Sequence, residues 1–182
     1  LGATGALGIV LLAQRDQGMA TVLVVTVLLL CYLGHMRGRW LAAMVGAAGL
    51  GLVIGILLEP YRLMRIKAFL DPLAYRTSFG WQILTMKTAI ARGGLAGVGL
   101  GRCPEKWHFL PEPHTDSIFC VIGSELGFLG ACAVLALTVV VVVGCLQIAA
   151  RTPDNFGYFA ASAVAIALGV QALVNTAVAV HL

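Results

Sequence analysis

Charged side chains are scarce in this sequence, and their scarcity excludes a water-soluble globular domain. Only 11% of the 182 residues are Asp, Glu, Lys or Arg, whereas 60% are hydrophobic. The mean hydropathy is +0.95, and several apolar runs are longer than a soluble core helix requires. The composition therefore predicts a polytopic membrane protein.

Three further features are missing from the sequence. The apolar runs lack the alternation of about 10 residues between turns that membrane-spanning strands show, which leaves helices. The five cysteines follow neither a disulfide framework nor the spacing of metal ligands, so we interpret them as packing residues. No initiator Met or basic leader region precedes the first apolar run, and we expect an internal segment of a longer protein.

Five apolar runs are present, and we interpret each as a helix in the membrane. One crossing requires about 20 residues for a hydrocarbon layer of about 30 Å. The runs are 2–13, which would be completed upstream, 19–34, 40–58, 118–150 and 158–180. The run 118–150 is long enough to extend beyond the layer or to tilt within it. We predict an all-α fold, a transmembrane helical bundle joined mostly by short turns.

One connection is long and polar. Residues 59–116 contain eight of the twelve Lys and Arg, five of the eight Asp and Glu, and five of the six prolines. Binding and catalytic residues lie on loops more often than on the elements that the loops connect. Ionisable residues in a membrane protein usually belong to a functional site. We predict transmembrane helices in 1–58, a large structured loop in 59–117 and transmembrane helices in 118–182, with the chemistry in the loop.

A segment of this loop, GWQILTMKTAIARGG from Gly80, predicts a short helix at the membrane interface. Its apolar side chains recur at helical spacing, and the glycines at its end act as a stop. Lys87 and Arg92 would either snorkel to lipid headgroups or form a basic patch for a phosphorylated lipid. The following GGLAGVGLG, residues 93–101, permits a backbone nest for phosphate, but close packing of its backbone against helices is the plainer interpretation.

The stretch HFLPEPHTDS, residues 108–117, gathers polar side chains beside an apolar run. Pro111 and Pro113 exclude helix for the residues before them, so Glu112 and His114 should be displayed on a fixed loop. Asp116 lies at the start of the next helix, where it could act simply as an N-cap. A cap does not explain why Glu112 and His114 accompany it, because an unpaired charge beside a membrane costs several kcal/mol.

Residues 80–130 resemble the core signature of the SEDS family (shape, elongation, division and sporulation), which includes FtsW and RodA. LPEPHTDSIF is the most specific part, and RDQGMATVLVVTVLLLCYLG, FLDP and QALVNTAVAV extend the resemblance over nearly the whole chain. GVGLG and VIGSELG are more similar to the FtsW branch than to the RodA branch. Arg15, Arg92 and Ser124 depart from the family pattern, and none of them lies in the HTD triplet.

The resemblance implies a ten-helix glycosyltransferase of the bacterial inner membrane, of which this chain would supply about five helices. Such an enzyme polymerises lipid II, the lipid-linked disaccharide precursor of peptidoglycan, for cell division or elongation, with a class B penicillin-binding protein as transpeptidase. Other division or elongation membrane proteins and membrane lipids are further expected partners, and nucleic acid is not. The resemblance also places the loop outside the cytoplasm, whereas the distribution of Lys and Arg leaves its side open.

The implied reaction requires one carboxylate rather than two. A sugar hydroxyl that attacks an anomeric carbon bearing pyrophosphate needs a base beside it and positive charge near the leaving phosphates. An inverting displacement with this activated leaving group needs no protein acid. We therefore predict Asp116 as the catalytic general base. The predicted substrate-binding residues are Glu112, His114, Lys106, Arg102 and Lys87. We predict no specific cofactor, and a divalent cation (Mg²⁺ or Mn²⁺) is the alternative to the basic side chains. We identify no metal ligands.

Two other functions remain open. A flippase for the same lipid could line its path with Asp16, Glu125, Gln171 and Asn175, and a non-catalytic division scaffold would leave the loop carboxylates unexplained. Glu125 follows Asp116 by nine residues, about 900° of rotation, so on a continuous helix the two point to opposite faces and are not a catalytic pair. We expect Glu125 to pair with another helix.

Overall fold

Helices account for the regular secondary structure in the described part of the chain. The computed structural model describes residues 17–58, 64, 67–69, 71–75, 79–103 and 118–180, and these ranges contain no strand. The prediction of an all-α fold, typical of a polytopic membrane protein, is therefore confirmed.

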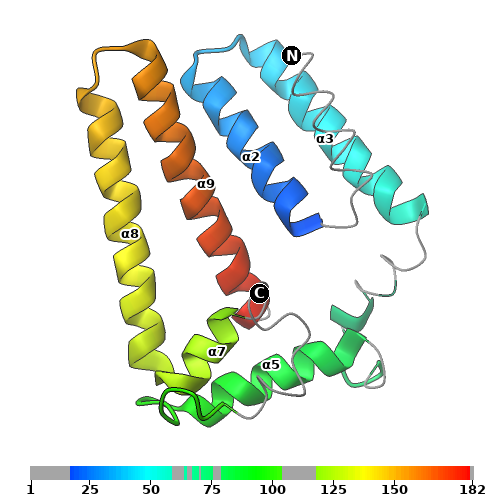
Figure 1. The fold of residues 1–182 in the computed structure, drawn as a ribbon. Coiled ribbons are helices and arrows are strands. Elements are labelled where there is room, and N and C mark those ends of the chain that lie inside the picture. The colour runs from blue at the N-terminus through cyan, green and yellow to red at the C-terminus, as the bar shows by residue number, and fades with distance from the viewer. Residues whose placement is uncertain are drawn as a thin grey trace. The chain divides into compact units, whose positions relative to one another are not determined.

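Figure 1 shows the helices and their order along the chain. They are α2 (Gln17–Leu33), α3 (Gly38–Leu58), α5 (Phe79–Gly93), α7 (Ile118–Glu125), α8 (Gly127–Arg151) and α9 (Asn155–Val180). The predicted runs 19–34, 40–58 and 158–180 correspond to α2, α3 and α9. The predicted run 2–13 lies outside the described residues.

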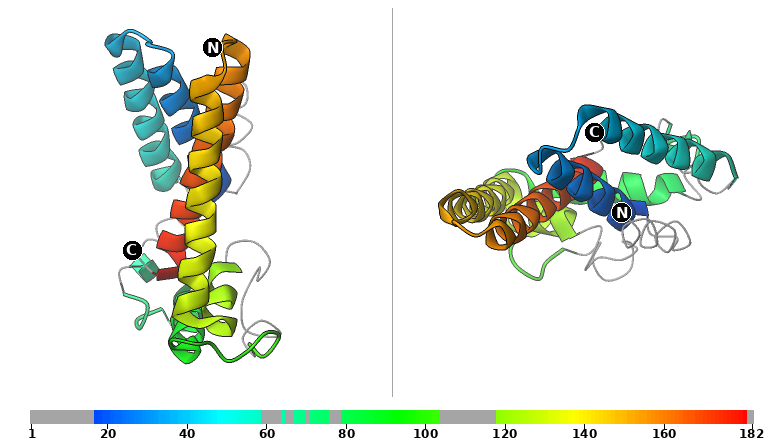
Figure 2. Two further views of the ribbon diagram at one scale, coloured as in Figure 1. Left: turned by 90° about the vertical axis from the view of Figure 1, so that its left-hand side faces the viewer. Right: turned by 90° about the horizontal axis from the view of Figure 1, so that it is seen from above.

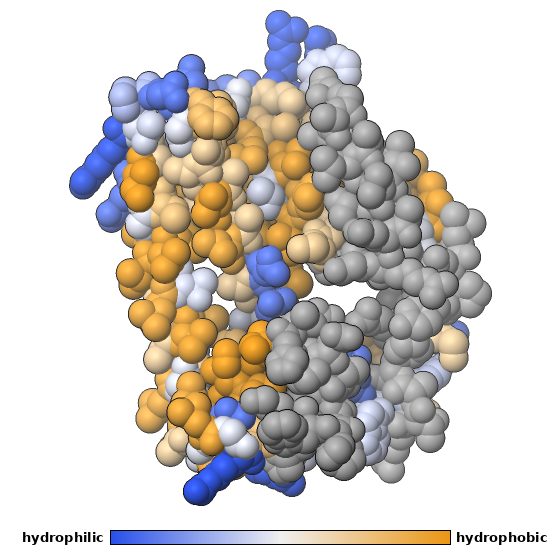
Figure 3. Space-filling model, viewed as in Figure 1, coloured by the Kyte–Doolittle hydropathy of each residue, from blue (hydrophilic) through white to orange (hydrophobic). Residues whose placement is uncertain are grey.

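Three of the described helices are long and apolar enough to cross a membrane. The apolar stretches are Gly38–Gly55 in α3, Gly127–Arg151 in α8 and Asn155–Val180 in α9, and Met19–Leu33 of α2 is apolar but shorter. Large side chains such as Leu137 and Val140 of α8 are exposed, and Figure 3 shows apolar side chains along this helix. Helices that expose apolar side chains on this scale suit lipid rather than water. The chain is a multi-pass membrane protein.

Short turns join α2 to α3 and α8 to α9. In the first turn, the Gly34 amide donates to the Leu30 carbonyl at 2.9 Å, and the chain reverses at His35, whose φ is 50°. In the second turn, Asp154 caps the start of α9, where its Oδ2 accepts a hydrogen bond from the Gly157 amide at 3.0 Å. These bonds satisfy backbone groups that helix ends otherwise leave without partners.

The chain forms two compact units, which we describe separately. The first contains Leu1–Leu58 and Val139–Val174, and the second contains Glu59–Thr138 and Asn175–Leu182. In the first unit α2 packs against α3, and the views in Figure 2 agree that they lie side by side. The predicted boundaries at 58 and 117 concern position relative to the membrane and stay a prediction.

In the second unit, α5 packs against α7. Met86 of α5 is buried in a hydrophobic cluster with Cys120 and Val121 of α7 and Ala179 of α9. The helix predicted from Gly80 is thus confirmed as α5, because its apolar spacing produces one buried face. Its location at a membrane interface stays a prediction.

The prediction of a single helix over 118–150 is wrong. α7 ends at Glu125 and α8 begins at Gly127, whose φ of +70° is readily adopted only by glycine and interrupts the helix. α8 alone is long enough to cross a membrane, so neither tilt nor extension is needed to explain the length of the run. α7 has eight residues and is too short to be stable by itself, so its placement depends on its contacts.

Candidate functional site

The described residues include two of the six predicted site residues. Lys87 lies on α5 and Arg102 follows the glycine-rich segment, and both are exposed. The catalytic candidate Asp116 and the candidates Glu112, His114 and Lys106 lie outside the described residues, and their roles stay predictions. The structure does describe the elements that flank these residues in sequence, which are α5 before them and α7 after them.

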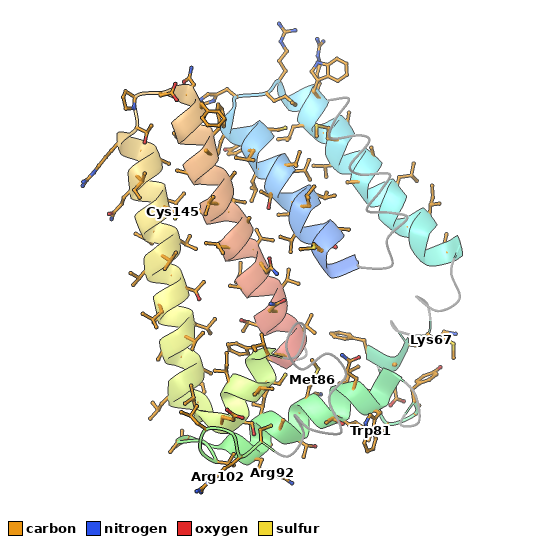
Figure 4. All side chains as sticks on the ribbon, in the orientation of Figure 1. Lys67, Trp81, Met86, Arg92, Arg102 and Cys145 are labelled. Carbon is orange, nitrogen blue, oxygen red and sulfur yellow. The ribbon has the colours of Figure 1, made fainter. Side chains whose placement is uncertain are left out.

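The exposed surface of α5 and the segment that follows it is basic. Lys87, Arg92 and Arg102 are all exposed, and the sequence from Phe79 to Cys103 contains no Asp or Glu. Figure 4 labels Arg92 and Arg102, both of which extend outward at the lower edge of that view. A surface with three exposed cations attracts anionic groups such as phosphate.

The segment 94–101, which we call the glycine loop, has an unusual backbone. Four of its residues have positive φ angles: Gly94 (52°), Gly97 (81°), Gly99 (102°) and Gly101 (75°). Side chains with a Cβ rarely adopt this conformation, which explains why glycine recurs at these positions. The loop can therefore turn tightly and bring its backbone close to other elements.

The glycine loop supplies hydrogen-bond acceptors to the start of α8. In a continuous helix the amides of Phe128 and Leu129 would donate to the carbonyls four residues earlier. Here the Phe128 amide donates to the Gly94 carbonyl at 2.9 Å, and the Leu129 amide donates to the Leu95 carbonyl at 3.2 Å. Two amides at the start of α8 are thus satisfied by the loop rather than by α7.

The same loop supplies hydrogen-bond donors to the end of α7. The Val98 amide donates to the Ser124 carbonyl and the Gly99 amide donates to the Glu125 carbonyl, both at 3.0 Å. These two carbonyls are the ones that a continuous helix would pair with the first amides of α8. Together the four bonds replace two bonds of the helix, and the loop becomes part of the helix ladder at the break. We call this arrangement of residues 94–99, Leu126 and Gly127 the joint.

Close backbone contacts hold the joint together. A Cβ added at Gly97 would collide with the Glu125 carbonyl oxygen, and one added at Gly127 would collide with the Gly97 nitrogen. A Cβ at Gly93, the last residue of α5, would collide with the Gly123 carbonyl oxygen. Glycine is therefore required at three positions for steric reasons, so that α5, α7 and α8 can meet through their backbones.

These bonds decide between the two interpretations of residues 93–101. The amides of Val98 and Gly99 donate to α7, and the Gly97 amide donates to the Gly93 carbonyl at 2.7 Å. Amides bonded in this way are not available to bind phosphate. Backbone packing against helices is confirmed, and a phosphate nest formed by these three amides is wrong.

Two polar side chains are buried at the end of α7. Ser124 is fully buried, and within the described part of the chain its Oγ has no hydrogen-bond partner. Glu125 is 8% exposed, and its backbone carbonyl is held by the glycine loop. The prediction that the Glu125 side chain pairs with another helix stays a prediction.

Two cysteines are also fully buried in the second unit. Cys103 follows the glycine loop and Cys120 lies in α7. Burial raises the pKa of the Cys120 thiol from 9.0 to about 12, and the neighbouring Cys103 adds to this rise. A thiol with this pKa stays neutral at physiological pH and behaves as a small apolar side chain. The interpretation of these two cysteines as packing residues agrees with their burial.

Metal ligands do not gather among the residues that the structure describes. No group of three His, Cys, Asp or Glu within these ranges is placed to hold a metal ion. The divalent cation stays a prediction.

Sequence reasoning missed the joint, which is the main structural feature of this region. The glycines of residues 93–101 were recognised as a packing or binding element, but their partner was not identified. The sequence did contain a local signal of a break, because Gly127 and the charged Glu125 interrupt the apolar run close together. The apolar sequence on both sides of it concealed the break.

Comparison with known proteins identifies relatives along nearly the whole chain. The family model for the cell cycle proteins FtsW, RodA and SpoVE matches residues 2–182. "Probable peptidoglycan glycosyltransferase FtsW" of Geobacter sp. (strain M18) is 36% identical over 169 residues, which are 93% of this chain and 46% of the relative. The protein with the same name from Trichlorobacter lovleyi is 38% identical over 168 residues, 92% of this chain and 44% of the relative. "Stage V sporulation protein E" of Bacillus subtilis (strain 168) is 34% identical over 171 residues, 93% of this chain and 46% of the relative. The chain spans less than half the length of these relatives.

Proposed function

Because this chain belongs to the FtsW, RodA and SpoVE family of cell cycle proteins, we propose that it is part of a peptidoglycan glycosyltransferase that polymerises lipid II into glycan strands. The observation that carries the proposal is the family match over 2–182. The names of the relatives from Geobacter and Trichlorobacter point to the same activity. Membrane-spanning helices suit a substrate that is anchored in lipid.

Asp116 serves as the general base in this proposal. It deprotonates the acceptor sugar hydroxyl as that oxygen attacks the anomeric carbon of the donor, with inversion, and pyrophosphate leaves with the lipid carrier. Asp116 precedes Ile118, the first residue of α7, by two residues, so its Cα lies within about 7 Å of the start of this helix in any conformation. Glu112 and His114 orient the substrate or tune the carboxylate.

Basic side chains stabilise the pyrophosphate as charge develops on it. Lys87 and Arg102 support this role because they are exposed on the basic surface of the second unit, and Lys106 lies between that surface and Asp116 in sequence. Fixed positive charge near a leaving phosphate lowers the energy of the transition state. Mg²⁺ or Mn²⁺ bound with the substrate is the alternative source of this charge.

The partners and the location of the protein belong to the same proposal. We infer a bacterial inner-membrane protein with residues 59–117 outside the cytoplasm, where lipid II presents its sugars after translocation. A class B penicillin-binding protein would act as the transpeptidase, and other division or elongation proteins would join the assembly. Anionic and zwitterionic membrane lipids surround the apolar helices.

The proposal is tested with purified full-length protein and its transpeptidase partner. Lipid II is supplied in detergent or proteoliposomes, and glycan strands are separated by gel electrophoresis. Polymer that depends on Asp116 supports the enzyme. Translocation of lipid II across the proteoliposome membrane without polymer formation would identify a flippase. If neither translocation nor polymer is observed, the result favours a non-catalytic scaffold.

A further inference from the structure

Through the joint, the glycine loop helps to set the orientation of α7. α7 is anchored at its C-terminal end, where the Ser124 and Glu125 carbonyls accept hydrogen bonds from the Val98 and Gly99 amides. Its eight residues are too few for an independently stable helix. The orientation of α7 is therefore set by the joint and by its packing against α5.

The length of α7 turns a small change at the joint into a displacement at the other end. Eight residues of helix span about 12 Å, so a tilt of about 5° at the joint moves the first residue by about 1 Å. Misplacement of a reacting group by about 1 Å can cost about 10²-fold in rate. Asp116 lies two residues ahead of Ile118 in sequence, so the start of α7 is the described element next to the proposed base.

Backbone contacts make the joint stiff. Gly93, Gly97 and Gly127 each lie so close to another backbone that no Cβ fits. Backbone atoms cannot move aside as a flexible side chain can, so a methyl group at any of these positions must shift one element relative to the next. The four hydrogen bonds across the break resist such a shift, because they provide the partners that the backbone groups at the two helix ends need.

We propose that Gly93, Gly97 and Gly127 are positioning residues for glycosyl transfer, which act by fixing α7 and, through it, the carboxylate of Asp116. The proposal rests on the function proposed above. It assigns to the glycine loop a role that differs from phosphate binding: the loop sets the geometry of the base and leaves recognition of the pyrophosphate to the basic side chains.

Gly101 provides a matched control within the same loop. Its φ of +75° is close to the +81° of Gly97, so alanine introduces similar backbone strain at both positions. A Cβ at Gly101 would meet nothing within 4 Å, whereas at Gly97 it would strike α7. The difference between Gly97→Ala and Gly101→Ala therefore isolates the contact with α7 from the strain of the loop.

The experiment compares polymerisation by the two variants in the full-length protein with its transpeptidase. Gly97→Ala should lower kcat by about 10- to 100-fold while KM for lipid II stays within about twofold, because the base is displaced and the substrate contacts remain. Gly101→Ala should keep kcat within about threefold of the parent. Equal kcat values for the two variants, with both proteins folded, would overturn the proposal.

A double variant shows whether the joint acts through Asp116. If it does, Gly97→Ala combined with Asp116→Asn should be no slower than Asp116→Asn alone, because the group being positioned has already been removed. A further loss in the double variant would mean that the joint serves another group. Parental activity of Asp116→Asn would instead show that the proposed base is wrong, so the two failures are distinguishable.

If Gly97→Ala does not insert or fold, a milder variant and a direct measurement can still test the proposal. Ala96→Gly loosens the loop at an exposed position without any clash, and a loss of kcat with unchanged KM supports the proposal, whereas parental kcat contradicts it. In the parental protein, the amides of Val98, Gly99, Phe128 and Leu129 should exchange hydrogen as slowly as amides in the middle of α8. Rapid exchange at these four amides would show that the joint is not rigid enough to position α7.

Discussion

The Val98 amide donates to the Ser124 carbonyl at 3.0 Å, in the place where the Phe128 amide would donate if the helix were continuous. This one bond joins two segments that are separated by 25 residues of sequence. It gives a hydrogen-bond donor to a carbonyl at the end of α7, which has no partner within its own helix. The bond also explains how a helix break can be stable between α7 and α8, because the glycine loop supplies the donors that the helix no longer provides.

We expect Asp116→Asn to lower the rate of lipid II polymerisation by about 10² to 10⁴. Asparagine can still accept the hydrogen bonds of an N-cap but cannot accept the proton of the sugar hydroxyl. The measurement is glycan formation by purified protein with its transpeptidase, together with thermal unfolding to show that the fold is kept. Near-parental polymerisation would reduce Asp116 to a helix cap and direct the search to Glu112.

Neutralising the basic surface should weaken both lipid II binding and the chemical step, because the same cations meet the pyrophosphate before and during its departure. Lys87→Gln, Arg102→Gln and Lys106→Ala are each expected to raise KM for lipid II, and the increase should shrink at high salt because exposed charges are screened. Lys67→Gln is the control, since Lys67 is an exposed cation of the same unit to which we assign no role. A KM that is the same for Lys67→Gln and for the other three variants would contradict the assignment.

Gly127→Ala should destabilise the protein by about 1–2 kcal/mol or more, because the methyl group meets the Gly97 nitrogen and the left-handed backbone disfavours any Cβ. Gly144→Ala is the matched control within α8, where a Cβ would meet nothing within 4 Å. Alanine at that helical position should be neutral or stabilising by about 0.5–1 kcal/mol. Thermal unfolding of the two purified variants measures the difference. Similar melting temperatures would show that the backbone contact at Gly127 is not important for stability.

The Cys120 thiol should resist alkylation in the folded protein. Its pKa is raised to about 12 by burial, so at pH 8 only about one thiol in 10⁴ is ionised. Ala91→Cys, at an exposed position of α5, provides a reactive thiol for comparison under a maleimide reagent. Because the folded protein holds this proton more tightly than the unfolded chain, the Cys120 thiol contributes fully to stability below pH 9.0, and this contribution is lost as the pH rises toward 12. Equal labelling of Cys120 and the Ala91→Cys thiol would show that α7 opens readily.

Local sequence determined the membrane helices and the family. α2, α3 and α9 were predicted from uninterrupted apolar runs, because the free energy of placing a helix in lipid depends mostly on its own side chains. α5 was predicted from its helical periodicity and the glycines at its end, which are also local signals. The SEDS resemblance carried by LPEPHTDSIF is confirmed by the family match over 2–182.

Only the tertiary structure decided where the last apolar stretch divides. The break lies in a stretch that is apolar apart from Ser124 and Glu125, so hydropathy averaged over the length of a helix gives no boundary there. The prediction of one helix over 118–150 was wrong. The break is stable because the carbonyls of Gly94 and Leu95 and the amides of Val98 and Gly99 complete its hydrogen bonds. A pairing between segments so far apart in sequence leaves no periodic signal in either one. The composition of residues 93–101 permitted either a phosphate nest or backbone packing, and the nearby end of α7 decided in favour of packing.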